Sequence, residues 1–166
     1  MTTSFTHIDD NGQVRMVDVT AKKISERIAI AKGAISMQPS TFSMIYNLSL
    51  KKGNVLETAR IAGIMGAKKT AELIPMCHPL NLTHIQVDFL PNKETSTIWI
   101  EAIIKIIHST GVEMEALTAV SVAALTIYDM CKSHDRAMTI SNIQLIKKSG
   151  GKSGTFISQI NEVIND

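Results

Sequence analysis

The stretch from residue 112 to residue 132 limits the possible folds more than any other part of the chain. It carries Glu113 and Glu115 at its start and Lys132 at its end, which is the charge order that a helix dipole favours. This pattern predicts one long helix. Its apolar side chains do not share one stripe, and they include Leu117, Val120, Val122, Leu125, Ile127 and Met130. A single sheet cannot cover all those faces, so we expect another subunit to cover part of this helix.

The composition agrees with burial between subunits. The chain has 166 residues without a compositional break, which predicts a single domain over residues 1–166. Charged residues make up only 19% and hydrophobic residues 45%, a low charge content for a small monomer. The net charge of +2 is too small for a general nucleic-acid binder.

Three features favour a cytoplasmic protein that does not enter a membrane. Cys77 and Cys131 are too few for a disulfide framework, which fits a reducing compartment. Residues 1–10 lack the charged and apolar regions of a signal peptide. The longest uncharged run, residues 116–128, is too short to cross a bilayer.

The order of predicted elements indicates the fold class. Strands are expected over residues 16–19, 27–37, 82–90, 96–107 and 138–148, and helices over 41–48 (capped by Ser40), 55–73, 112–132 and a short stretch from Thr155. The turn between the two middle strands is placed at residues 91–93. Apart from the N-terminal addition, this order matches an α+β, ferredoxin-like fold, in which helices pack on one face of an antiparallel sheet. With the overly apolar helix, it predicts an oligomer.

Two groups of charged residues on the long helix are candidates for chemistry. Glu113 and Glu115 are ordinarily partners of the helix dipole, and their spacing points them to different sides, so they need not share a role. Asp129 and Lys132 are three residues apart, so they form either a surface pair worth a few tenths of a kcal/mol or, if shielded, a proton relay. The spacing alone favours neither interpretation.

The proline-flanked loop at residues 75–79 holds Cys77 and His78. A zinc site needs three or four ligands, and no CxxC or HxxxH pair is present, so we expect no metal here. A rigid loop that presents backbone groups and an imidazole to a ligand is one interpretation, and a purely structural loop is the other.

The glycine-rich stretch at residues 150–154 resembles the end of a phosphate-binding loop. A true P-loop would need a glycine at Ile146, so the sequence does not predict a nucleotide hydrolase. Small residues still let backbone amides approach an anion. The nearby lysines would neutralise charge, and a triphosphate would suit the whole set: Lys147, Lys148 and Lys152, with Lys51, Lys52, Lys68 and Lys69. A flexible, solvated basic surface is the alternative.

Several longer motifs together resemble the MoaC family of cyclic pyranopterin monophosphate synthases, also called molybdenum cofactor biosynthesis protein C. The resemblance runs from about Phe5 to Gly154. It is carried by residues 5–9, 16–19, 59–65, 72–80 and 148–154, and above all by the unbroken stretch 111–132.

The resemblance implies a lyase of molybdenum cofactor biosynthesis. Its substrate would be (8S)-3',8-cyclo-7,8-dihydroguanosine 5'-triphosphate, and its products cyclic pyranopterin monophosphate and diphosphate. It implies no metal or organic cofactor. It also implies a homohexamer of three dimers, with each active site at a dimer interface.

The matched motifs assign roles to individual residues. Asp129, Lys132 and Lys52 would be catalytic, the two lysines transferring protons at a pKa lowered by neighbouring cations, with Asp129 orienting Lys132. Lys148 and the glycine loop with Lys152 would hold phosphate, whereas His78 and Glu115 would orient the purine portion. The remaining expected substrate contacts are Met76, Cys77, Glu113 and Met114.

This sequence departs from the family pattern at three positions. Asn54 replaces the usual Asp, and it should still cap a helix. Gly66 replaces the usual Ala within a helix, at a cost of about 1 kcal/mol. Ser109 replaces a basic residue, which puts a minor phosphate contact in doubt.

Outside the resemblance, two other functions remain open. A ferredoxin-like domain with basic loops also suits a non-catalytic module that senses a nucleotide. A purely structural oligomerisation protein is the third option, and it leaves the placement of the lysines and of Asp129 unexplained.

Overall fold

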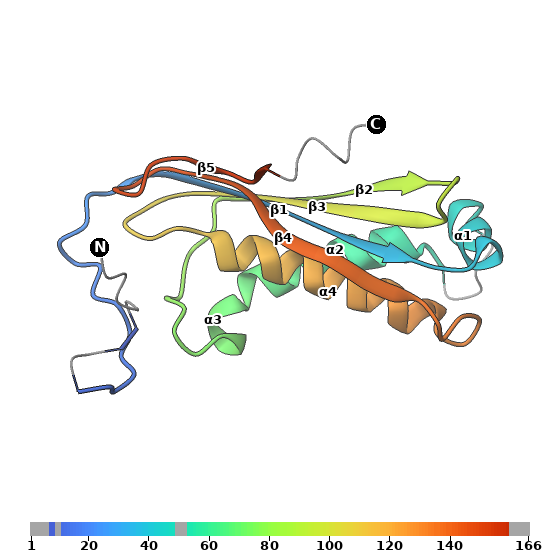
Figure 1. Cartoon of the computed structure of the whole chain (residues 1–166), viewed down its shortest axis with the longest axis horizontal. Helices are drawn as coiled ribbons and strands as arrows, with labels where there is room; N and C mark the ends of the chain where they lie inside the picture. The colour runs from blue at the N-terminus through green and yellow to red at the C-terminus, as the bar shows by residue number, and fades with distance from the viewer. Residues whose placement is uncertain (1–6, 9–10, 49–52, 160–166) are drawn as a thin grey trace.

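A five-stranded antiparallel sheet forms one layer of the molecule, and the two long helices form the other (Figure 1). The computed structural model describes residues 7–8, 11–48 and 53–159. The strands lie in the order β2-β3-β1-β4-β5. Their bounds are β1 Ser25–Ser36, β2 His84–Asn92, β3 Thr97–His108, β4 Thr139–Ser149 and β5 Phe156–Ile157. The order of the first four strands, with helices between β1 and β2 and one helix between β3 and β4, confirms the ferredoxin-like α+β prediction.

β1 lies at the centre of the sheet because its sequence alternates with period two. It pairs with β3 along its whole length and with β4 on its other side. Ala29, Ala31 and Ile35 point into the core on one face, as the alternation predicts. Arg27 has the same phase and is also buried, at 8% exposure. A charged side chain therefore enters the body of the protein near the beginning of β1.

α4, Glu113–Cys131, lies against the sheet beside α2, Val55–Lys68 (Figure 1). Ten of its nineteen residues are buried, so it is the core helix of this layer. Its length and composition would also suffice to cross a membrane, a property that core helices of globular proteins share. Its apolar surface is not fully covered within one chain, because Leu125 on its outer side is 58% exposed. Ile61 and Met65 on α2 are similarly exposed, at 60% and 52%.

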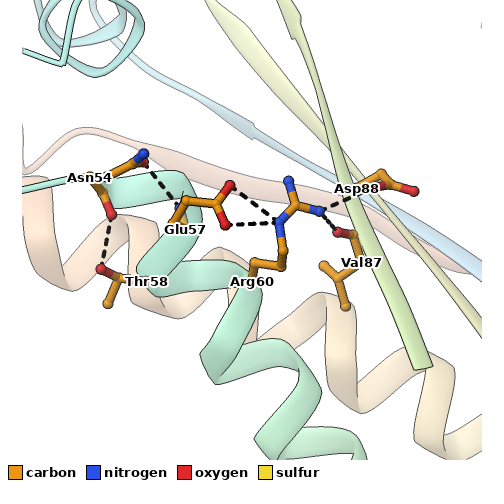
Figure 2. A network of polar contacts seen from close by, with 6 residues as sticks. All are labelled: Asn54, Glu57, Thr58, Arg60, Val87 and Asp88. Atoms are coloured by element: carbon orange, nitrogen blue, oxygen red, sulfur yellow. Dashed lines mark hydrogen bonds and ion pairs between the residues drawn. The ribbon is translucent and has the colours of Figure 1, made fainter. Parts of the chain in front are cut away.

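Arg60 ties α2 to the edge strand β2 (Figure 2). Its Nε donates to the Glu57 carboxylate on the same helix at 3.3 Å, and Nη1 donates to Asp88 Oδ1 at 3.1 Å and to the Val87 carbonyl. The guanidinium also stacks over the ring of Phe89. These contacts fix the position of α2 across the sheet.

Two of the three departures from the family pattern have a clear structural setting in these helices. Asn54 caps α2, since its Oδ1 accepts a hydrogen bond from Glu57 N at 3.1 Å, and this confirms the predicted cap. Gly66 of α2 faces Val122 of α4, where an added Cβ would lie 2.8 Å from Val122 Cγ2. The glycine thus allows α2 and α4 to approach closely, which offsets its low helix propensity.

Two predicted helices differ from the observed ones. α1, Pro39–Tyr46, begins at Pro39 rather than after Ser40, because a proline suits the first helical position. Its N-cap is Gln38, which makes no side-chain cap, so the predicted Ser40 cap is wrong. The helix predicted over residues 55–73 is two helices, α2 and the short α3, Thr70–Leu73. Lys69 separates them, since its N–H bonds back to the Gly66 carbonyl in a tighter turn.

Three predictions about strands and the tail are also wrong. Residues 16–19 are extended but pair with no strand. The turn after β2 comes after residues 91–92, since Pro91 is tolerated in an edge strand. Where a helix was expected from Thr155, Phe156–Ile157 form β5, and residues 160–166 lie outside the described part of the chain. Ser158 N donates to the Ile146 carbonyl, because β4 has an edge to which a strand can be added.

Candidate functional site

A cavity of about 1050 Å³ lies at the end of the sheet where β1 begins, β4 ends and α4 begins. Five basic side chains and one carboxylate line it: Lys22, Lys23, Arg27, Lys148, Lys152 and Glu113. The glycine turn at residues 150–151 closes one side. The excess of positive charge, together with the positive end of the α4 dipole, favours a polyanionic guest.

Arg27 forms the fixed part of this cavity. Its Nε donates to the His108 carbonyl at 3.1 Å, and its Nη2 donates to the Ser109 carbonyl at 2.9 Å. The glycine turn packs directly on it, because a Cβ at Gly151 would overlap the guanidinium. Gly151 also has a φ of +76°, which favours glycine. Ser109 therefore contributes its carbonyl by holding Arg27, and its side-chain type is not needed for that contact.

Lys148 is the cavity residue whose ammonium group can change its partner. Its Nζ lies 3.3 Å from Glu113 Oε1 and 2.8 Å from Ser153 Oγ. Both members of the ion pair remain more than a quarter exposed. An anion that enters the cavity can therefore replace Glu113 as the partner of this ammonium group.

A second cavity of about 220 Å³ adjoins the first. The loop after α3 supplies Met76, Cys77 and His78, and the first turn of α4 supplies Met114 and Glu115. Four residues line both cavities, namely Lys22, Thr110, Gly111 and Glu113. The structure thus brings together the predicted substrate contacts from three distant segments of the chain, in two neighbouring chambers.

Glu115 is the most perturbed carboxyl group of the second cavity. It is 4% exposed, and burial raises its pKa to about 7, with a smaller contribution from the charge of Glu113. Burial, and then the charge of Glu115, also raises the pKa of the Cys77 thiol. Glu115 can thus accept or donate a proton near neutral pH, whereas Cys77 stays a neutral thiol.

Asp129 and Lys132 form the predicted pair, but at the other end of α4. Asp129 Oδ1 and Lys132 Nζ are 2.7 Å apart, and the two side chains are 68% and 55% exposed. The hydrogen bond from Lys132 to Asp129 raises the pKa of Lys132, contrary to the lowered pKa expected of a base. Asp129 follows Glu113 by sixteen residues, which is about 24 Å along a helix. One chain alone therefore does not bring this pair to the cavities.

Of the other predicted lysines, those within the described part of the chain do not line the cationic cavity. Lys52, with its neighbour Lys51, lies outside the described residues. Lys68 and Lys69 line neither cavity. Among residues 7–8, 11–48 and 53–159, no three His, Cys, Asp or Glu side chains come close enough together to hold a metal ion.

Sequence reasoning missed Lys22, Lys23 and Arg27, which all line the larger cavity. For Arg27 the sequence did contain a signal, because this arginine occupies a core-facing position of an otherwise apolar strand. Lys22 and Lys23 left none, since two adjacent lysines before a strand are usually solvated.

Comparison with known proteins places the chain among close relatives. The family model described as the MoaC family matches residues 16–151. The chain is 64% identical over 155 residues to a protein of Desulfatibacillum aliphaticivorans named cyclic pyranopterin monophosphate synthase, and the match covers 93% of this chain and 98% of that protein. Proteins of the same name from Desulforapulum autotrophicum and Thermomicrobium roseum are 63% and 55% identical. These matches cover 94% and 91% of this chain, and 96% and 91% of those proteins.

Proposed function

This chain belongs to the MoaC family, lyases of molybdenum cofactor biosynthesis, and from that premise we propose that its substrate is (8S)-3',8-cyclo-7,8-dihydroguanosine 5'-triphosphate. In this reaction the five-membered ring of the purine opens and the pyranopterin forms. A cyclic phosphate then closes at the phosphorus nearest the sugar, and diphosphate leaves. The product is cyclic pyranopterin monophosphate. No metal or organic cofactor has a role in this proposal.

The observation that carries the proposal is the cationic cavity with a smaller chamber beside it. A triphosphate is a polyanion, and Lys148, Lys152 and Arg27 supply the opposite charge around the larger cavity. Positive charge that already surrounds the departing diphosphate stabilises it as the bond to phosphorus breaks. Lys148 would leave Glu113 and bind the phosphate chain.

The smaller chamber suits the part of the substrate that becomes the pterin. Its walls combine the apolar Met76 and Met114 with the polar His78 and Glu115. A buried carboxyl group with a pKa of about 7 can exchange protons with ring nitrogens in both directions. We assign the orientation of the base to His78 and Glu115, with Cys77 as a neutral contact.

The proposed catalytic role of Asp129 and Lys132 implies that a second copy of the chain contributes to each site. Asp129 lies about 24 Å along α4 from Glu113, which lines both cavities, so a site that contains both sets would take them from different copies. Leu125, one turn before Asp129 on α4, is 58% exposed, which leaves an apolar surface beside the pair. A two-fold dimer would form two such sites, and three dimers would form the expected homohexamer.

Contact with another copy would also change the chemistry of the pair. Loss of water around Lys132 lowers the pKa of an amine, whereas in a single chain the bond to Asp129 raises it. Lys132 can then transfer protons with Asp129 as its orienting partner. Lys52 keeps its proposed role as the second proton-transfer group, and a cytoplasmic location is part of the same proposal.

The direct test is the stoichiometry of the reaction. Purified protein is supplied with the cyclised triphosphate, and the pterin product and diphosphate are both measured. We expect one diphosphate for each cyclic pyranopterin monophosphate. Binding of the triphosphate without release of diphosphate would contradict the proposed reaction.

A further inference from the structure

The described residues before β1, 7–8 and 11–24, form an arm that lies against the body of the protein. In Figure 1 this arm is the blue segment beyond the end of the sheet at which α4 begins. Val17 and Val19 are partly buried, whereas Met16, Asp18 and Thr20 are exposed. This alternation shows that one side of the extended segment contacts the body. No strand pairs with it, so the contact is made by side chains.

A turn at the end of the arm fixes where Lys22 lies. Asp18 Oδ1 accepts hydrogen bonds from Thr20 N at 2.9 Å and from Thr20 Oγ1 at 2.6 Å. Lys22 N then donates to the Val19 carbonyl at 3.0 Å. The aspartate thus organises the turn with its side chain, as such residues commonly do.

The buried side of the arm lines the smaller cavity. His7, Val17 and Val19 line it together with Cys77, His78 and Glu115 from the body. Lys22 lines this cavity and also the larger, cationic one. The arm therefore supplies two valines to the chamber and one ammonium group to the junction of the two chambers.

We propose that this arm is a specificity-determining wall of the substrate site, in which Val17 and Val19 pack against the heterocyclic base and Lys22 binds the phosphate chain. The inference rests on the proposed function for the identity of the ligand. Small apolar side chains next to polar groups suit a flat heterocycle, because they exclude water from its face while the polar groups orient its edges. Lys22 lies where the chamber for the base meets the chamber for the phosphate chain, since it lines both.

Two probes separate the contributions of the arm. GTP carries both a purine and a triphosphate, whereas inorganic triphosphate carries only the charge. The variant Val17→Asn/Val19→Asn changes the two inward positions. The matched control Met16→Asn/Ile24→Asn makes the same kind of change at exposed positions before β1, where the side chains are 49% and 72% exposed. Lys22→Met removes the shared ammonium group.

Affinities measured by calorimetry should follow a distinct pattern. Val17→Asn/Val19→Asn should weaken GTP binding about tenfold and leave triphosphate binding unchanged, because the loss concerns only the base. Lys22→Met should weaken the binding of both probes, and the control should bind both as the unchanged protein does. Unaltered triphosphate binding by the valine variant also shows that the body of the protein is folded.

The inference is overturned if the valine variant binds GTP as tightly as the control, or if it loses GTP and triphosphate binding equally. Failure of the proposed function gives a different result. In that case the arm variants would still distinguish the two probes, but the unchanged protein would release no diphosphate from the cyclised substrate.

Discussion

Lys148 Nζ lies 3.3 Å from Glu113 Oε1, so an ion pair connects the end of β4 to the first turn of α4 beside the cationic cavity. Both side chains are partly exposed, and such pairs contribute at most about 1 kcal/mol to stability. The pair therefore matters for where it holds the ammonium group rather than for the stability of the fold.

Lys148→Ala should lower kcat/KM about 10- to 100-fold, because one charge-assisted contact to phosphate is lost. The free energy of unfolding should change by less than about 1 kcal/mol. Lys147→Ala is the matched control, since Lys147 precedes Lys148 on the same strand and lines neither cavity. Steady-state kinetics and urea unfolding of both variants measure these two quantities. Equal losses of kcat/KM in the two variants would contradict a specific role of Lys148.

Gly151→Ala should impair substrate binding as well as stability. A Cβ at this position would overlap the Arg27 guanidinium, so the glycine turn and Arg27 must move apart. Gly154→Ala is the control, because Gly154 has a φ of +66° but an added Cβ there would meet no atom within 4 Å. We expect both variants to lose about 1 kcal/mol from the left-handed backbone, and only Gly151→Ala to lose triphosphate affinity as well. Normal affinity in Gly151→Ala would argue against the close approach of the turn.

Glu115 should make the protein less stable as the pH rises from about 4.5 to 7. Its folded-state pKa of about 7 exceeds its ordinary value of 4.5 because it is buried. In that pH window the unfolded chain has released a proton that the folded protein retains, so the free energy of unfolding falls with rising pH. The full loss is on the order of 3 kcal/mol and is complete above pH 7.

Glu115→Gln should remove this pH dependence, since glutamine does not ionise. Other groups titrate similarly in both proteins, so the difference between the two unfolding free energies isolates Glu115. Urea unfolding at pH 5 and pH 8 measures it. If the difference between the two unfolding free energies is the same at pH 5 and pH 8, Glu115 is ionised in the folded protein at both pH values.

Co-expression of two variants with strongly reduced activity tests whether one site is built from two copies. Lys148→Ala disables the cavity end of α4 and Lys132→Ala the other end. In random dimers of the two, one site of each mixed dimer keeps both lysines, so activity should return to roughly a quarter of the unchanged level. Lys148→Ala mixed with Arg27→Ala is the control, because both changes lie at the same end and leave no intact site. Absence of recovery in the first mixture would place each site within one copy.

Most of the fold was predictable from sequence because its main elements carry strong local patterns. The alternation in β1 and the charge order of α4 each predict an element within two residues of its observed bounds. The unpaired stretch at residues 16–19 and the pairing of β5 were not predictable. Their sequences suit an extended chain or a helix, and only the position of a neighbouring edge or surface decides which one forms.

The sequence predicted most of the residues of the candidate site, but it predicted only partly which of them lie close together. The motifs around Cys77, Glu115 and Lys148 do meet around adjoining cavities. The separation of Lys132 from them follows from the length of α4, which places the two ends of one helix far apart. The roles of Lys22 and Arg27 depend on a tertiary arrangement that no local spacing encodes.

The number of residues in α4 fixes both the distance between its two ends and the direction in which the side chains at each end point. One inserted residue between Glu113 and Asp129 would advance the far end by 1.5 Å and rotate it by about 100°. Asp129 would then face a different side of the molecule, even if the helix stayed intact. Gains or losses of residues should therefore be tolerated in the loops, for instance between β2 and β3, and not within this helix.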